Sequence, residues 1–314
     1  MNLSIELGLA HALSAATRTG LFQALLEAPG TAEALAHRAA LSPRGTALLL
    51  DAMVAADLAT RSDGGEFAPS DRARVWSDEI PRGVAAELAL WHHLETFTRT
   101  GEPLLDMTGT SAERDAAYRG VVTSLKALWG DAAEALAARL PPAASVLDVG
   151  CGSGVWSLAM AARAPASQVT GLDLPAVLDA FRAEARARGL RATALPGDMH
   201  TAELGGPYAR VVVANVLRLE APHRARALLQ RLAGAVAPGG ELIVVDALVG
   251  GSPQREQERT VYALHLALRA RGAEVHRESS IRAWLADAAF AHAEFIELSA
   301  ASGAIGALRA RREA

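Results

Sequence analysis

The sequence predicts an α/β protein in which a doubly wound, mostly parallel sheet follows a mostly helical N-terminal domain. Three observations support this fold class. A glycine-rich turn follows a short apolar run at 145–149, apolar strands alternate with helices after it, and the first 140 residues have mainly helical spacing of apolar side chains. With 314 residues, of which 51% are hydrophobic, the chain is long enough to form two domains with separate cores.

The first 100 residues are predicted to form a winged-helix-like domain. Residues 3–28 have the spacing of two helices, and Thr31 is placed to cap the helix that follows. Ser42, followed by a proline, begins another helix, and an Asp-Gly-Gly turn indicates a hairpin within 60–69. Helix, helix and hairpin in this order are typical of a winged helix, which can bind DNA or serve for dimerisation.

Residues 101–140 are predicted to be a helical connector or lid, and 141–314 a second domain that binds the ligand. Helical spacing runs from 71 to 140, with interruptions near 101–103 and at Gly130. Two prolines follow Leu140 and mark the boundary between the domains.

Charge and cysteine content limit the possible partners. The net charge is −4, and the expected recognition helix at 43–57 has Arg44 as its only basic residue, so we expect no nucleic acid partner. No uncharged apolar stretch is long enough to span a membrane, and the N-terminus lacks the basic start of a secretory signal. Cys151 is the only cysteine, which excludes a disulfide within the chain and favours a cytoplasmic location. We expect no metal site.

The most informative stretch is the turn Asp-Val-Gly-Cys-Gly-Ser-Gly. Glycine is expected there because the turn is tight and a ligand must approach the backbone. The dinucleotide fingerprint would require glycine or alanine where Val155 stands. The pattern Asp148-x-Gly150-x-Gly152-x-Gly154 instead resembles motif I of the class I S-adenosylmethionine-dependent methyltransferases. Their ligand carries an ammonium and a sulfonium, so a carboxylate near the turn is favourable.

Two further strands end in acids. Asp173 closes the strand after the motif I helix, at a distance suited to hydrogen bonds with ribose hydroxyls. Asp198 closes the next strand, where it is placed to accept from an adenine amino group while Met199 packs on the ring. The predicted cofactor-binding residues are therefore Asp148, Gly150, Gly152, Gly154, Asp173, Leu174, Asp198, Met199 and Asn215.

The remaining elements continue the alternation of strands and helices. We expect strands at 209–217, 241–248, 294–298 and 304–308, and helices at 222–236, 256–270 and 280–289.

The whole chain resembles the small-molecule O-methyltransferases of the plant caffeate type and the bacterial natural-product type. The residues that carry the resemblance are 21–22, 31–35 and 48–54 in the N-terminal half, and 148–154, 197–199, 237–240 and 244–246 in the C-terminal half. The resemblance implies a Rossmann-like sheet that binds S-adenosylmethionine and an N-terminal domain that forms a homodimer. It also implies a natural-product-like acceptor, aromatic or polyketide.

The resemblance fails at the position of the family's catalytic base. In the family the fourth strand ends in Leu-His-Asp-Trp, and the histidine deprotonates the substrate hydroxyl. Here the corresponding residues are Leu-Arg-Leu-Glu, with Arg218 in place of the histidine. A guanidinium stays protonated at ordinary pH, so Arg218 cannot accept a proton. Asp246 and Glu274 match family positions where acids flank the base.

Three outcomes follow from this replacement. Another histidine is the base: His265 at a substrate-contact position, His200 beside the adenine residues, or one of His92 and His93, which follow Trp91 where the family's helical lid meets substrate. Alternatively, the acceptor is already substantially ionised and Arg218 stabilises its anion. In the third outcome no methyl group moves, and the cofactor serves hydroxylation, decarboxylation or pericyclic chemistry.

We predict O-methylation, with C- or N-methylation and the non-methylating reactions as alternatives. Alignment of the acceptor with the departing sulfur would supply most of the rate, and general base catalysis would add roughly 10²–10⁴-fold. The predicted catalytic candidates are His265, His200, Arg218, Asp246 and Glu274, and the predicted substrate-binding residues are Trp91, His92, His265 and Arg269.

Overall fold

The computed structural model describes residues 3–75, 87–104, 122, 125–247, 253–298 and 305–313. The chain divides into two compact units, Met1–His93 and Leu94–Ala314, and each is described by itself. The helices expected within 76–86 and 105–121 lie outside the described residues. None of the helices in the described ranges combines the length and the apolar character that a membrane span requires.

The first unit is mainly helical, as the spacing predicts. It contains α1 (Leu3–Arg18), α2 (Leu21–Glu27), α3 (Ala32–Arg38), α4 (Pro43–Ala55), the hairpin strands β1 (Ala59–Arg61) and β2 (Phe67–Pro69), and α5 (Asp71–Val75). The Thr31 hydroxyl accepts from the Ala34 N–H at 3.3 Å and caps α3, and Ser42 caps α4 in the same way. The expected caps and the hairpin are therefore confirmed.

The second unit is built on a seven-stranded mixed sheet. Its strands are β3 (Ser145–Val149), β4 (Gln168–Asp173), β5 (Ala192–Pro196), β6 (Tyr208–Ala214), β7 (Val236–Asp246), β8 (Phe290–Leu298) and β9 (Ile305–Arg312). Their order is β5-β4-β3-β6-β7-β9-β8, and β9 is antiparallel to both of its neighbours. The strand order reverses between β3 and β6, and ligands of such sheets bind at the carboxyl ends beside that reversal.

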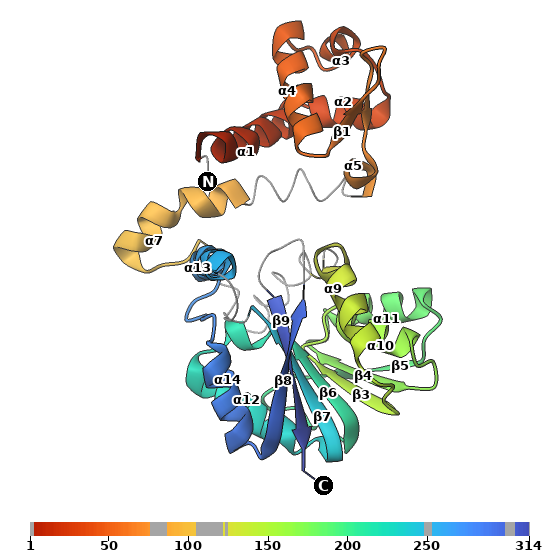
Figure 1. Ribbon diagram of the computed structural model, residues 1–314, viewed down its shortest axis with the longest axis vertical. Helices are drawn as coiled ribbons and strands as arrows, with labels where there is room; N and C mark the ends of the chain where they lie inside the picture. The colour runs from red at the N-terminus through yellow and green to blue at the C-terminus, as the bar shows by residue number, and fades with distance from the viewer. Residues whose placement is uncertain are drawn as a thin grey trace. The chain divides into compact units, whose positions relative to one another are not determined.

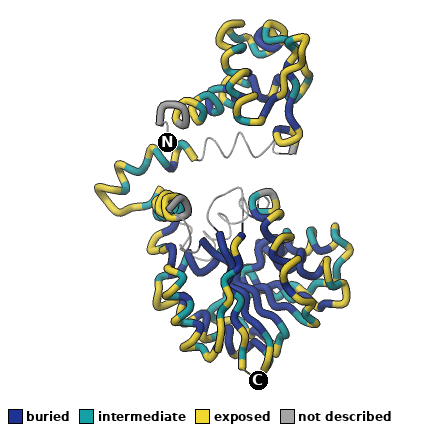
Figure 2. The backbone as a smooth tube through the Cα atoms, in the orientation of Figure 1, coloured by how far each residue is buried: buried dark blue, intermediate teal, exposed yellow. Residues whose placement is uncertain are grey.

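Helices cover both faces of the sheet (Figure 1). They are α9 (Leu125–Arg139), α10 (Val155–Ala162), α11 (Leu178–Ala187), α12 (Pro222–Ala233) and α14 (Glu278–Asp287), with α7 (Leu94–Thr100) and α13 (Pro253–Ala267) elsewhere in the unit. One core cluster packs α12 and α14 against the strands, and another packs α9 and α10 against the opposite face. Figure 2 shows the strands as the most continuously buried part of the unit. The expected α/β class is confirmed.

Several boundaries of helices and strands differ from the sequence prediction. β6 ends at Ala214 instead of continuing to 217, because Asn215 adopts a left-handed φ of 61° and a 3-10 turn, η1 (Leu217–Leu219), follows. Gly130 lies inside α9 and does not interrupt it. α12 ends at Ala233 instead of 236, and β7 begins at Val236 instead of 241. The first of these differences shapes the site.

Candidate active site

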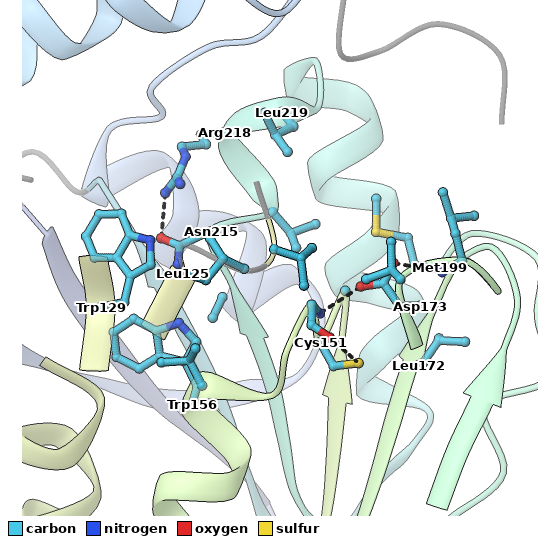
Figure 3. Close-up of a pocket in the computed structure, with 18 of the residues that line it drawn as sticks. Leu125, Trp129, Cys151, Trp156, Leu172, Asp173, Met199, Asn215, Arg218 and Leu219 are labelled. Carbon is cyan, nitrogen blue, oxygen red and sulfur yellow. Dashed lines mark hydrogen bonds between the residues drawn. The ribbon is translucent and has the colours of Figure 1, made fainter. Parts of the chain in front are cut away.

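The motif I turn lines a cavity at the carboxyl ends of β3, β4 and β6 (Figure 3). The part of the cavity wall formed by its glycines, Gly150 and Gly152, is named the glycine wall below. Gly150 and Gly152 line this cavity and have left-handed φ values of 69° and 56°. A Cβ on Gly150 would lie 2.6 Å from Cγ2 of Val216, and one on Gly152 would lie 2.8 Å from Cδ1 of Leu125. Side chains are thus excluded where a ligand must approach the backbone.

Asp173 holds this turn in place from the end of β4. Its Oδ2 accepts from the Gly152 N–H at 2.8 Å, and its Oδ1 accepts from the Leu174 N–H at 2.7 Å. Asp173 and Leu174 both line the cavity. An ionised carboxylate has about four acceptor positions, so one side chain can bond both the turn and a ligand hydroxyl.

Asp198 and Met199 line the cavity from the segment after β5. Oδ1 of Asp198 accepts from the His200 N–H at 2.8 Å, which orients the carboxylate. The Arg231 Nε donates to the Met199 carbonyl at 3.0 Å and fixes the same segment. In Figure 3, Asp173 and Met199 lie at one end of the cavity, opposite Trp129 and Arg218.

Asp148 and Gly154 lie behind the turn and are not among the residues lining the cavity. Asp148 is 1% exposed and accepts from the Ser157 hydroxyl at 2.5 Å. Burial raises the pKa of the Asp148 carboxyl to about 7. A Cβ on Gly154 would meet the Phe181 ring at 2.7 Å, so this glycine permits close packing against α11. Their placement does not support the predicted direct contact with the cofactor.

Arg218, which the resemblance sets at the position of the family's base, lines the cavity, and its side chain is paired with an acid. The left-handed turn at Asn215 folds the chain back, and Nη1 of Arg218 donates to Oδ1 of Asn215 at 2.6 Å and to Oδ1 of Asp246 at 2.9 Å. The Arg218 N–H donates to Oδ2 of Asp246 at 3.1 Å. Arg218 is 7% and Asp246 3% exposed, so the two form a buried ion pair at the ends of β6 and β7.

Aromatic rings surround this guanidinium. Cζ of Arg218 lies 5.9 Å from the ring centre of Trp129 and 5.4 Å from that of Tyr262, within cation–π distance. Cζ of Arg269 lies 5.7 Å from the same Tyr262 ring, and its Nη2 donates to the Tyr262 hydroxyl at 3.0 Å. Trp129, Trp156, Arg218 and Arg269 line one end of the cavity, and this aromatic and cationic end is named the acceptor end below.

Sequence reasoning missed three aromatic residues: Trp129 and Trp156, which line this end, and Tyr262, which contacts both of its arginines. A signal was available for two of them. Trp156 comes two residues after the last motif I glycine, and Tyr262 lies one helical turn before His265, on the helix already considered for substrate contact. Trp129 carried no signal, because its position depends on how α9 packs against the sheet.

No histidine is among the described residues that line the cavity. Nε2 of His200 lies 3.0 Å from Oε1 of Glu220. His265 lies on α13 with its ring centre 6.2 Å from that of Tyr262. Neither placement supports the predicted role as base. Trp91 and His92 belong to the first unit, so their contact with substrate stays a prediction.

Glu274 acts through its backbone and not through its carboxylate. Its side chain is exposed, and its N–H donates to the Arg218 carbonyl at 2.9 Å. His276, buried and absent from the predicted site, places Nε2 at 2.9 Å from the Leu217 carbonyl and 3.1 Å from that of Glu220. The segment 274–276 therefore holds the η1 turn that carries Arg218, and the catalytic role predicted for Glu274 is not supported.

Comparisons with known proteins agree with this geometry. The family model described as the O-methyltransferase domain matches residues 84–291. Acetylserotonin O-methyltransferase of Mus musculus is 30% identical over 303 residues, which cover 86% of this chain and 77% of that protein. The chain belongs to the O-methyltransferase family.

Other relatives of this O-methyltransferase match over most of their length. The tetracenomycin polyketide synthesis 8-O-methyl transferase TcmO of Streptomyces glaucescens is 27% identical over 300 residues, covering 89% of this chain and 87% of TcmO. The solved structure of an O-methyltransferase family protein from Burkholderia thailandensis has a TM-score of 0.76 and 22% identity, covering 99% of this chain and 96% of that one. The structural likeness shows the fold.

Membership of the family confirms two predictions from the sequence. The protein is an enzyme that transfers a methyl group to a small molecule, and its cofactor is S-adenosylmethionine. The cavity fits this cofactor, because the glycine wall leaves room for a ligand against the backbone and two acids, Asp173 and Asp198, line the adenosine end. The alternatives of C- or N-methylation and of non-methylating chemistry are not favoured.

Proposed function

We propose that this enzyme methylates an oxygen of an aromatic or polyketide natural product. The adenosine of the cofactor would lie at the Asp173 end of the cavity, and the substrate at the acceptor end. The observation that carries this proposal is one cavity whose wall includes both the motif I glycines with their acids and the residue at the family's base position, Arg218.

At the adenosine end, each residue has a distinct part. Asp173 would accept from the ribose hydroxyls while it keeps the Gly152 N–H in place at 2.8 Å. Asp198 would accept from the adenine amino group, and the polarisable Met199 side chain would pack on the ring. Leu174 follows Asp173 in the same wall, whereas Asn215 lines the cavity beside Arg218, where the methionine moiety would lie.

At the acceptor end, the chain positions the substrate and excludes water. When bound, the cofactor supplies a methyl group on a positively charged sulfur, which is a good leaving group. Trp129 and Trp156 offer apolar ring faces to an aromatic acceptor. Alignment of the acceptor with the methyl group would then supply most of the rate enhancement, since the described cavity wall contains no imidazole.

The acceptor class is supported by what the relatives act on. One is named for acetylserotonin and another for a tetracenomycin polyketide. The test is a reaction with S-adenosylmethionine labelled with ¹³C in the methyl group and a panel of hydroxylated aromatic polyketides. We expect the label to appear as a methoxy carbon in the NMR spectrum. A label on carbon or nitrogen, or turnover that leaves the cofactor intact, would contradict O-methylation.

We propose that the N-terminal domain, with its winged-helix-like order of elements, joins two copies into a cytoplasmic homodimer. The first unit has its own core, and α4 exposes 62% of Leu48 to solvent. The single cysteine, Cys151, accords with a reducing compartment. Light scattering should give the mass of a dimer for the wild type and of a monomer for Leu48→Glu or for a second variant in the first unit, Leu7→Glu. A wild-type monomer would contradict the proposal.

A further inference from the structure

We propose that the acceptor oxygen enters the cavity already ionised, so that the substrate is an acidic phenol, enol or carboxylic acid bound as its anion against Arg269. This inference rests on the proposed function and deepens it by naming the chemical class of the acceptor. Two observations carry it: a cation at the acceptor end without an acidic partner in the described part of the chain, and a described cavity wall without histidine.

Arg269 lines the cavity and is held in place by Tyr262. Its Nη2 donates to the Tyr262 hydroxyl at 3.0 Å, and its Cζ lies 5.7 Å from the centre of that ring. Its Nε is buried and has no hydrogen-bond partner among the described residues. Because Arg269 lines the cavity and pairs with no carboxylate among the described residues, a bound anionic oxygen that accepts from its guanidinium would gain a charge-assisted hydrogen bond.

Arg218 cannot supply the same attraction, although it lines the same end. Its charge is balanced by the Asp246 carboxylate at 2.9 Å, with Asn215 as a further acceptor. No described carboxylate lies within ion-pair distance of Arg269. The acids that line the cavity, Asp173 and Asp198, belong to the adenosine end. The acceptor end is therefore positive, and the bound sulfonium would increase this charge.

An ionised acceptor removes the need for a base. The lone pair of the acceptor oxygen forms the new bond to the methyl carbon, and the carbon–sulfur bond breaks with its electron pair going to sulfur. The anion and the sulfonium are both neutralised, and no proton is transferred in the step. A guanidinium at the position of the imidazole is compatible with this chemistry, because nothing at that position has to accept a proton.

The test uses nitrophenols of one and two rings, whose phenolates absorb visible light and whose neutral phenols do not. Each probe is added to the full-length protein saturated with S-adenosylhomocysteine, at a pH just below the probe's own pKa. We expect the phenolate absorbance to rise on binding. Arg269→Gln should weaken phenolate binding roughly tenfold or more, and Arg269→Lys should retain part of it.

Arg271→Gln is the matched control. Arg271 is two residues away, 54% exposed and paired with Glu102, so the variant removes the same charge outside the cavity and should bind the probes as the wild type does. The proposal is overturned if no probe binds as a phenolate while S-adenosylhomocysteine binds normally. It is also overturned if Arg269→Gln weakens S-adenosylhomocysteine and spares the phenolate, because Arg269 then serves the cofactor. Absence of S-adenosylhomocysteine binding to the wild type would instead contradict the proposed function.

Discussion

Asp246 accepts two hydrogen bonds from Arg218, one from its side-chain Nη1 at 2.9 Å and one from its backbone N–H at 3.1 Å. The residues are 28 positions apart in the chain, and the adjacent strands β6 and β7 bring them together. Arg218, the residue that the resemblance sets at the base position, is therefore part of a buried ion pair whose charges balance. This arrangement fixes the turn beside the glycine wall and leaves proton removal to the acceptor's own acidity.

Breaking this pair on one side should destabilise the fold. In Arg218→Met the Asp246 carboxylate stays buried with only backbone donors, and we expect a loss of about 3 kcal/mol in the free energy of unfolding. Urea denaturation measures it. The double variant Arg218→Met/Asp246→Leu should recover much of the loss, because no unpaired charge remains. Equal stability of the wild type and Arg218→Met would show that the pair is not formed in solution.

Adding a methyl group at the glycine wall should lower stability and cofactor affinity more than adding one at a glycine with open space around it. Gly150→Ala combines a left-handed φ of 69° with a Cβ placed 2.6 Å from Val216. Gly272→Ala is the control, because its φ is 71° and no atom lies within 4 Å of the added Cβ. We expect the control to lose about 1–2 kcal/mol from backbone strain alone and Gly150→Ala to lose more. Calorimetric binding of S-adenosylmethionine should weaken only in Gly150→Ala. Equal losses in the two variants would contradict the close packing.

Asp173 should contribute strongly to the affinity for S-adenosylmethionine. Asp173→Asn keeps one acceptor oxygen and loses the charge, so either the Gly152 or the Leu174 N–H loses its partner. We expect the dissociation constant for S-adenosylmethionine to rise about 10- to 100-fold. Asp179→Asn, an exposed acid paired with Arg182, is the control and should bind normally. Unchanged calorimetric affinity for Asp173→Asn would remove Asp173 from the site.

Asp148 should make stability depend on pH between about 4 and 7. The folded protein holds this carboxyl with a pKa of about 7, above its ordinary value of 3.8, mainly because it is buried. The folded state thus binds more protons, and the free energy of unfolding falls as pH rises through this window. A shift of about three units corresponds to at most about 4 kcal/mol.

The measurement is urea denaturation of the cofactor-free protein at pH 5 and pH 8. Asp148→Asn should gain stability relative to the wild type at pH 8, because no buried charge forms, and should gain little at pH 5. Asp131→Asn, at an exposed position on α9, should show no such difference. The same pH dependence in Asp148→Asn and in the wild type would exclude this carboxyl as its source.

Neither His200 nor His265 should act as a base. Neither lines the cavity among the described residues, and His200 is engaged by Glu220 at 3.0 Å. We expect His200→Ala and His265→Ala to keep kcat within roughly threefold of the wild type, well short of the 10²–10⁴-fold contribution of a general base. A hundredfold loss in either variant that added imidazole restores would identify the missing base.

Much of the fold could be predicted from local sequence. The helix starts at Thr31 and Ser42 could be predicted, because a serine or threonine before helical apolar spacing is typical of an N-cap. The end of β6 could not be predicted, because the apolar Val216 and Leu217 follow Asn215 and extend the expected strand, whereas the left-handed φ of Asn215 ends it. Gly130 was misjudged since tertiary packing outweighs its weak helix propensity inside α9.

The cofactor end of the site could be predicted better than the acceptor end. Asp173 and Asp198 come at the ends of consecutive parallel strands, so their meeting at one edge follows from topology. The pairing of Arg218 with Asp246 depends on the register of β6 and β7 and on the turn at Asn215. The sequence could not show that Asp148, although part of motif I, bonds Ser157 behind the turn and does not line the cavity.

The central claim is that the cavity at the carboxyl ends of β3, β4 and β6 holds S-adenosylmethionine with its adenosine toward Asp173. The most direct measurement is a crystal structure of the protein with S-adenosylhomocysteine. We predict ribose hydroxyls within hydrogen-bond distance of Asp173, adenine beside Asp198 and Met199, and the sulfur toward Arg218 and Trp129. Density for the compound elsewhere on the protein, with this cavity closed by the chain's own side chains, would contradict the account.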